Sequence, residues 1–464
     1  MLVARRTKAA SAVLATVLLS VSTAFAIPVI PGAAGFGIDT PAGRGGTIYK
    51  VTNLNASGSG SLKACVDGAT PRVCIFEISG TINLTSDLVI RNNFLTIAGQ
   101  TAPSPGIMIR GAAIKIQASD VLIQHLRIRP GDAATGPDPA NRDALKIEGS
   151  AAKPVRNIVI DHCSFSWAID ETLSVWGPTD NITLSNNIFA EPLNESIHPA
   201  ASGTGVVKHG FGVILGTSPG NSVTMIGNLF AHSVERNPLS RASELVFANN
   251  IVYDRGTMDL DLQSDGVIAT KNTVVNNLFI RGPSYARDTT PIYIRTSGSL
   301  ALGPGSRVYQ AGNHSYDYVR EMMSFTGGAI SGLLQQDSYP VWNSSLSVLN
   351  TANNAVYDKV LNTSGARPAD RDAVDKRIVS HVRNRTGQVI NCVASNGTTR
   401  CNKNAGGWPT LAVNRRTLTP PSNPNGVATN GYTNLENWLN SHGQTVTGTV
   451  QGSSPSAPLA LTAY

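Results

Sequence analysis

Charged residues and long apolar runs are both scarce in this sequence, and each absence excludes a class of protein. Charged side chains make up 14% of the 464 residues, and no Lys/Arg run or basic stripe interleaved with aromatic residues appears, which argues against a nucleic-acid partner. Beyond residue 26, no segment reaches the roughly 18 uncharged apolar residues of a membrane-spanning helix. Amphipathic helical stretches are scarce too. Runs of β-branched residues bounded by Gly, Asn and Asp recur instead and predict an all-β chain.

Cysteine is also infrequent, and its spacing excludes the usual thiolate metal sites. The chain has five cysteines and no CxxC or Cys/His spacing typical of zinc ligands. Cys65 and Cys74 flank one short loop, and Cys392 and Cys401 flank another, so we expect two local disulfides and an oxidising compartment. The remaining Cys163 follows an apolar strand and is predicted to be a buried thiol.

The first residues have the composition of a processing signal. A basic stretch, an apolar core over 9–21 and an A-x-A site at 24–26 predict that 1–26 is a signal peptide and that the protein is secreted. Its removal takes away three of the 37 basic residues and none of the 30 acidic ones, which leaves a net charge of about +4. A mildly basic protein weakly favours an anionic substrate. We expect a monomer with no membrane partner and no nucleic-acid partner.

One amide or thiol recurs at the same point of a repeated strand-turn pattern. Each of these residues follows a short apolar run and precedes another, at intervals of 24, 41, 22 and 27 residues: Cys163, Asn187, Asn228, Asn250 and Asn277. Such a period predicts a parallel β-solenoid, with one coil per interval and loops of varying length. The asparagines would stack as an internal ladder at one corner.

The pattern divides the chain into regions. We predict a β-helix with an N-terminal cap over 27–345, in which 27–60 and a short helix within 61–70 cover the first coil. A C-terminal region over 346–442 is expected to pack along the solenoid, and 443–464 is predicted to be a flexible tail.

The C-terminal region has helical patterns, and three long loops interrupt the repeat. The helical segments are expected at 371–385 and 435–442, and the interruptions fall at 129–143, 190–210 and 280–306. Loops of this length in a compact fold are usually functional.

Acidic and basic side chains flank successive coils. Asp143, Asp170 and Arg236 precede or follow neighbouring coils, which lie about 4.8 Å apart in a solenoid. Carboxylates without an imidazole or thiolate partner suit Ca²⁺, which takes oxygen ligands. Arginines nearby can grip a carboxylate in bidentate fashion. Together these groups favour an acidic polysaccharide bridged through Ca²⁺.

Two motifs resemble those of a known family. IVIDHCSFSW (158–167) is similar to the vWiDH motif of the pectate lyases of polysaccharide lyase family 1, and RNPLSR (236–241) matches their RxPxxR motif. PGAAGFGIDTPAGRGG (31–46) resembles the family's N-terminal cap. The resemblance extends from about 31 to 442 and implies a right-handed parallel β-helix.

The resemblance also implies roles for particular residues. Arg236 would be the base that removes the C5 proton, and Arg241 and Lys208 would bind substrate carboxylates. Asp161 and His162 would be structural supports beside the groove.

Calcium ligands follow from the same resemblance. Asp143 and Asp170 would bind the catalytic Ca²⁺. The family's third acidic ligand often lies four residues after the second, where this chain has Ser174, so Glu171 is the candidate to replace it. His198 and His209 are interpreted as ordinary loop residues.

The resulting hypothesis is a secreted pectate lyase. It would cleave polygalacturonate by Ca²⁺-assisted β-elimination and release 4,5-unsaturated oligogalacturonides. One alternative is a lyase acting on a methyl-esterified or other uronic-acid polysaccharide. A second is a β-solenoid that binds polysaccharide without cleaving it, and a third is a glycoside hydrolase on the same fold, which would give saturated products.

Overall fold

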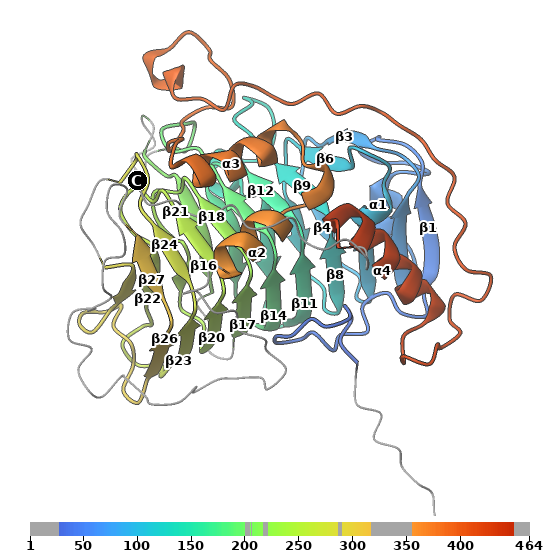
Figure 1. Ribbon diagram of the computed structural model, residues 1–464, viewed down its shortest axis with the longest axis horizontal. Helices are drawn as coiled ribbons and strands as arrows, with labels where there is room; N and C mark the ends of the chain where they lie inside the picture. The colour runs from blue at the N-terminus through green and yellow to red at the C-terminus, as the bar shows by residue number, and fades with distance from the viewer. Residues whose placement is uncertain are drawn as a thin grey trace, which may run out of the picture.

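Three parallel β-sheets wind into a solenoid in the computed structural model (Figure 1). The structure describes residues 27–199, 205, 207–216, 221–285, 290–316 and 355–449. Each coil passes through the three sheets in turn, and each strand pairs in parallel with its equivalent in the next coil. The predicted parallel β-helix is therefore confirmed. The predicted signal peptide and most of the predicted tail lie outside the described residues.

The sheets contain ten, eight and nine strands. The ten-stranded sheet is formed by β1 (Thr47–Val51), β2 (Arg72–Phe76), β5 (Leu95–Ala98), β8 (Val121–Gln124), β11 (Val155–Asp161), β14 (Thr179–Ser185), β17 (Ser222–Ile226), β20 (Glu244–Ala248), β23 (Lys271–Val275) and β26 (Arg307–Ala311). The eight-stranded sheet is formed by β4 (Leu88–Ile90), β7 (Ile114–Ile116), β10 (Leu145–Glu148), β13 (Glu171–Trp176), β16 (Phe211–Leu215), β19 (Leu239–Ser240), β22 (Leu260–Leu262) and β25 (Ile292–Ile294). The nine-stranded sheet is formed by β3 (Gly80–Asn83), β6 (Ile107–Arg110), β9 (Leu126–Arg129), β12 (Ser164–Ser166), β15 (Ile188–Ala190), β18 (Leu229–Ala231), β21 (Ile251–Tyr253), β24 (Leu278–Ile280) and β27 (His314–Tyr316).

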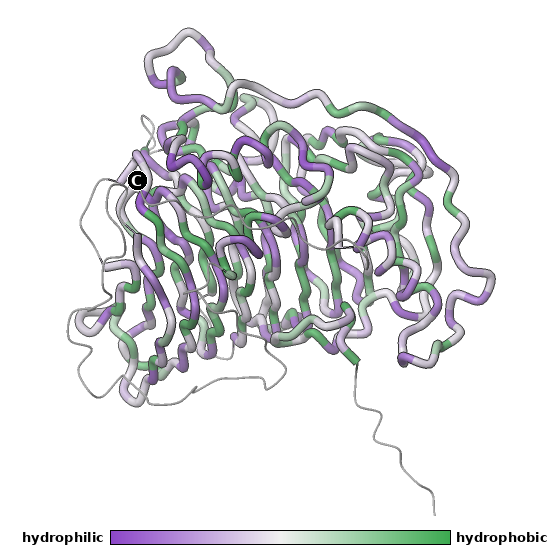
Figure 2. The backbone as a smooth tube through the Cα atoms, viewed as in Figure 1, coloured by the Kyte–Doolittle hydropathy of each residue, from purple (hydrophilic) through white to green (hydrophobic). Residues whose placement is uncertain are grey.

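The hydrophobic core runs along the solenoid axis. Alternate residues of each strand point inward, so apolar side chains in register form columns, and one such column is Ile97, Ile123, Ile160, Leu184, Met225, Phe247 and Val274. All of these side chains are buried, and burying each contributes about 1.5–3 kcal/mol. Figure 2 shows the apolar residues concentrated along the strands. Because the core grows by one layer per coil, the solenoid is stabilised by contacts between neighbouring coils.

The predicted asparagine ladder is confirmed. The Oδ1 atom of Asn228 accepts from the backbone amide and the side chain of Asn187, at 2.9 and 3.1 Å, and the same pattern recurs from coil to coil. Cys163 is the first residue of the column. Its backbone amide donates to Asn187 Oδ1, but its side chain is a thiol and has no amide group with which to continue the ladder. Asn313, which sequence analysis did not include, extends the column by one coil.

The residue before each ladder position has a left-handed backbone conformation. His162, Asn186 and Asn249 have φ values of 50°, 53° and 55°, and Gly227 and Gly312 have the same hand. Asn and Gly tolerate this conformation best, which explains why the Asn-Asn and Gly-Asn pairs recur in the sequence.

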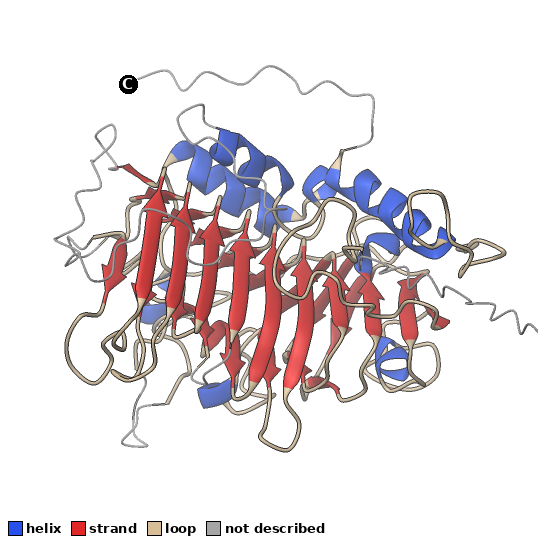
Figure 3. Cartoon of the chain, turned by 90° about the horizontal axis from the view of Figure 1, so that it is seen from below, coloured by secondary structure: helices blue, strands red, loops and turns tan. Residues whose placement is uncertain are grey.

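Helices cover two of the three sheets (Figure 3). Helix α2 (Ala355–Thr363) and helix α3 (Ala373–Asn384) pack their apolar faces on the outside of the nine-stranded sheet. Helix α4 (Asn434–Thr447) packs on the first strands of the ten-stranded sheet. These helices of the C-terminal region therefore lie along the solenoid. No described helix covers the eight-stranded sheet.

Two details of the predicted ends are wrong. The short helix α1 (Leu62–Val66) inserts Leu62 and Val66 into the core and covers the first coil as expected. Residues 29–42, however, lie alongside the ten-stranded sheet, because Val29 and Ile38 pack against Leu122 and Val159. Helix α4 continues to Thr447, so the chain at 443–447 is helical and not part of a tail.

Both predicted disulfides are present. Cys65 pairs with Cys74 and Cys392 with Cys401, with Cα–Cα distances of 5.9 and 5.3 Å. Cys163 is a buried free thiol, as expected, and burial raises the pKa of a thiol in such a place above its usual range. Within the described part of the chain, no helix has the length and apolar composition needed to cross a membrane.

Candidate active site

Four side chains that are distant in the sequence meet at one edge of the eight-stranded sheet. Asp143 lies two residues before β10, Asp170 and Glu171 lie at the start of β13, and Arg236 lies three residues before β19. Single carboxylate oxygens of the three acids lie within 4.8 Å of one another. We call these four residues the acid–arginine cluster. The structure thus brings together the predicted base and all three predicted metal ligands.

Asp143 is the most buried of the acids. One of its oxygens, Oδ2, accepts a hydrogen bond from Ser174, while Oδ1 is buried and has no hydrogen-bond partner among the described residues. Burial raises the pKa of Asp143 to about 7, with Asp170 adding to the rise and Lys146 opposing it. A buried carboxylate oxygen without a donor is suited to a cation.

Arg236 donates to Glu171 in a close ion pair. Its guanidinium also lies over the ring of Phe211, 4.3 Å from the centroid, and its side chain is 22% exposed. Burial lowers the pKa of Arg236 from its usual value; Arg241 lowers it further, and Asp170 acts in the opposite direction. The base candidate is thus held in an environment that disfavours its charged form.

Two imidazoles join the acids, against our expectation. His209 Nε2 lies 2.7 Å from Asp170 Oδ1 and 3.8 Å from Glu171, and its ring stacks on His198 at a centroid distance of 4.0 Å. The Nδ1 atom of His198 lies 3.0 Å from the carbonyl of Pro199, which leaves Nε2 facing Asp170 at 3.9 Å. The interpretation of both histidines as ordinary loop residues, and of the carboxylates as lacking an imidazole partner, is therefore wrong.

The two predicted substrate-binding residues differ in their placement. Arg241 follows β19 on the same sheet, and its guanidinium donates to Gln263 Oε1 at 3.2 Å. Lys208 lies on an exposed loop, pairs with Glu195 at 2.8 Å and has a side chain that is 74% exposed. Of the two, only Arg241 extends the face that carries the cluster.

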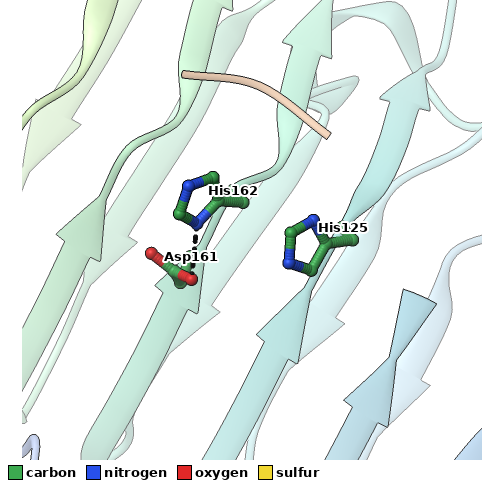
Figure 4. Close-up of side chains that lie close together, drawn as sticks. All are labelled: His125, Asp161 and His162. Carbon is green, nitrogen blue, oxygen red and sulfur yellow. Dashed lines mark hydrogen bonds and ion pairs between the residues drawn. The ribbon is translucent and has the colours of Figure 1, made fainter. Parts of the chain in front are cut away.

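Asp161 and His162 lie at a different sheet from the acid–arginine cluster. Asp161 ends β11 in the ten-stranded sheet and accepts from Gln124, Ser185 and His162, and Figure 4 shows His162 turned toward it beside His125. Burial alone would raise the pKa of Asp161, but His162, His125 and Asn186 hold it below the usual range. Burial lowers the pKa of His125 to about 3. The group is a buried support of the corner between two sheets.

Comparison with known proteins decides the family. No family model matches the chain. A protein of Aspergillus fumigatus named probable pectate lyase C is 30% identical over 438 residues, covering 90% of this chain and 94% of its own. The chain belongs to the pectate lyase family. Members of this family are polysaccharide lyases, so the chain is an enzyme of that class.

A second relative supports the same family. A protein of Aspergillus terreus with the same name is 36% identical over 261 residues, covering 56% of each chain. Among solved structures, the major allergen of cedar pollen superposes with a TM-score of 0.51 at 20% identity, over 71% of this chain and 91% of its own. At that identity, the likeness of this pectate lyase to the allergen shows the fold alone.

The sequence contained partial signals for the residues that were missed. His209 directly follows the predicted Lys208, but the 190–210 loop has no repeat from which a side chain's direction could be deduced. Lys146 was visible inside an apolar strand, where a charged residue is unusual. Ser174 stands where the family often has an acidic ligand, and its role as donor to Asp143 follows only from the register of β10 and β13.

Proposed function

We propose that this pectate lyase cleaves de-esterified polygalacturonate by β-elimination outside the cell and releases 4,5-unsaturated oligogalacturonides. Arg236 is the base, Arg241 and Lys208 bind substrate carboxylates, and Asp143, Asp170 and Glu171 hold Ca²⁺. The observation that carries the proposal is the acid–arginine cluster, in which one guanidinium of lowered pKa lies among three convergent carboxylates.

The donor set fits a calcium ion. The three carboxylates offer oxygen ligands within 4.8 Å of one another, and Asp143 Oδ1 has no other partner among the described residues. Calcium bound there would neutralise a substrate carboxylate and acidify the proton on the adjacent carbon. Ser174 already donates to Asp143 Oδ2 and Glu171 already binds Arg236, so we expect weaker calcium binding than three free acids would give.

The chain's own residues explain the proton transfer. Arg236 must lose a proton before it can accept one from C5, and burial together with Arg241 favours that loss. Rotation of Glu171 away from Arg236 would free the guanidinium and remove the neighbouring negative charge that favours its protonated form. As the C5–H electrons form the C4=C5 double bond, the C4–O bond breaks and the glycosidic oxygen leaves.

The test uses polygalacturonate, the full-length protein and the ultraviolet absorbance of the unsaturated product at alkaline pH. We expect product with calcium and little with EDTA. Arg236→Lys should abolish it, while the matched control Arg307→Lys, on the ten-stranded sheet, should not. If the folded protein gives no unsaturated product from this substrate at any alkaline pH, the proposal fails.

Other outcomes would identify the alternatives. Turnover of methyl-esterified pectin that EDTA leaves unchanged would indicate the other lyase, a reading that the Glu171–Arg236 pair favours because it removes one free acid from the metal site. Binding of polygalacturonate without turnover would indicate a binding protein.

A further inference from the structure

A second group of metal-ligating side chains lies beneath helix α3, where the chain leaves the nine-stranded sheet. Glu191, His232 and Asp254 directly follow β15, β18 and β21, which pair in register. All three have left-handed φ values of 55°, 60° and 54°, so the same turn recurs on successive coils and stacks their side chains in a column. His381 of α3 faces this column from outside. None of these residues belongs to the acid–arginine cluster.

The two histidines present their ring nitrogens to each other. His232 Nε2 lies 3.1 Å from His381 Nδ1, and the ring planes meet at 78°. The other nitrogen of His232, Nδ1, lies 2.6 Å from Asp254 Oδ2. When a buried carboxylate accepts a hydrogen bond from the N–H of one ring nitrogen, the lone pair of the other nitrogen is free, which is the arrangement that orients histidine ligands in metalloproteins.

Glu191 supplies a third ligand. Its Oε2 accepts from Trp167 Nε1 at 3.0 Å and from Arg377 at 2.6 Å. One ligand atom from each of Glu191, His232 and His381 lies within 4.8 Å of the other two. With Asp254, the column contains two carboxylates, and Arg377 offsets one of them.

The close approach of the two histidine rings requires a glycine beside them. Gly387 has φ +87°, and a Cβ there would lie 2.3 Å from His381 Nδ1 and 2.6 Å from His232 Cε1. Any larger residue would separate the two rings. The local sequence is therefore built to let both nitrogens approach one point.

We propose that Glu191, His232 and His381 bind a divalent transition-metal ion, best fitted by zinc, with Asp254 orienting His232. Two imidazoles and one carboxylate are a zinc donor set, whereas calcium takes oxygen ligands. Nitrogens 3.1 Å apart need only a small adjustment to lie at about 2.0–2.1 Å from a common tetrahedral ion. The ion joins α3 to the solenoid, and the site is independent of the proposed lyase reaction.

The experiment uses full-length protein that has been stripped with a chelator and titrated with Co²⁺, whose visible absorption reports tetrahedral ligation. Because His209 and Asp170 could also attract the ion, the titration is made in a His209→Gln background. We expect one equivalent of Co²⁺, displaced by Zn²⁺, and a rise of about 3 °C or more in the unfolding midpoint with Zn²⁺.

The matched variants are His381→Gln, which removes a ligand of the proposed zinc site, and His442→Gln, which removes a histidine of α4 outside that site. His381→Gln should lose both the absorption and the thermal shift, and His442→Gln should keep them. Absence of bound metal in the folded protein, or metal binding that His381→Gln leaves unchanged, would overturn the proposal. If His381→Gln does not fold, the zinc X-ray absorption spectrum of the His209→Gln protein decides, since two imidazole ligands support the site and an all-oxygen shell refutes it.

Discussion

Two groups of arginines and acids in this molecule have opposite properties. One is the acid–arginine cluster. The other, which we call the clasp, joins Arg127 and Arg129 of β9 to Asp372 and Asp375 at the start of α3, and the side chains of all four are 0–3% exposed. Arg129 contacts Asp372 at 2.5 Å and Asp375 at 2.8 Å. Two cations face two anions, so the clasp is balanced.

The charged forms of Arg129 and Asp372 are favoured in the clasp, whereas those of Asp143 and Arg236 are disfavoured in the acid–arginine cluster. Despite burial, Asp372 and Asp375 raise the pKa of Arg129, and Arg129 lowers the pKa of Asp372. In the acid–arginine cluster, burial raises the pKa of Asp143 and lowers that of Arg236. In a structural cluster the charged groups balance one another, whereas a reactive cluster contains groups whose charged forms are not balanced within the protein.

The largest expected effect is on catalysis. Arg236→Lys keeps a positive charge but loses the planar guanidinium, and we expect turnover of polygalacturonate to fall by about 10³–10⁴-fold, the upper range for loss of a general base. The measurement is the initial rate of unsaturated product. The unfolding midpoint should change little, since the side chain is partly exposed. A loss smaller than about tenfold would remove Arg236 from the role of base.

The clasp should respond in stability instead. Asp372→Asn retains the N-cap of α3, because Asn also caps well, but breaks the buried pair, which costs about 3–5 kcal/mol in the free energy of unfolding. Denaturant titration measures the change, and exposed Asp39→Asn is the control.

The pH dependence of that loss follows from the lowered pKa of Asp372. A carboxyl with a lowered folded pKa stabilises the protein above its unfolded value of about 3.9, and this stabilisation is lost as pH falls through the folded value. The gap between Asp372→Asn and the unchanged protein should therefore be full at pH 7 and shrink below about pH 4. A gap that is independent of pH would contradict the ion-pair explanation.

Asp143→Asn should act in the opposite direction. The folded pKa of Asp143 is about 7, above its unfolded value, so its ionisation costs stability as pH rises toward 7. In EDTA at pH 8 we expect the variant to be more stable by about 1–3 kcal/mol, and to bind calcium more weakly. Calorimetry measures both. A destabilised variant would show that Asp143 is a structural acid like those of the clasp.

The smallest effect is expected at Lys208. Its side chain is 74% exposed and pairs with Glu195 at the surface, where solvent screens such contacts. Lys208→Ala should raise KM for polygalacturonate by about two- to fivefold and leave kcat unchanged. Exposed Lys153→Ala is the control. A large fall in kcat would show that Lys208 moves into the acid–arginine cluster when substrate binds.

The repeat made the fold and part of the site predictable. Because the ladder asparagines recur once per coil, the sequence alone indicated that Asp143, Asp170 and Arg236 would converge, and they do. The RNPLSR and IVIDH motifs added the family. A repeat along the sequence is enough to predict which residues converge when the contacts are between neighbouring coils.

The features that the sequence did not predict depend on contacts that do not recur from coil to coil. His198 and His209 lie within the 190–210 loop, so nothing in their spacing indicated that their rings stack. Asp161 lies two residues before the ladder residue Cys163, yet it ends a strand of the ten-stranded sheet and not of the sheet that carries the acid–arginine cluster. His381 reaches its column only because α3 crosses the nine-stranded sheet at that height.

The asparagine ladder also fixes the spacing of the coils along the solenoid axis. Coils are spaced by about 4.8 Å whether 22 or 41 residues separate two ladder positions. An insertion in a loop therefore leaves every interatomic distance along the axis unchanged, whereas one residue added within a strand shifts its register. Loops of this chain can lengthen or shorten freely around fixed chemistry, and new substrate contacts can arise without moving Asp143 relative to Arg236.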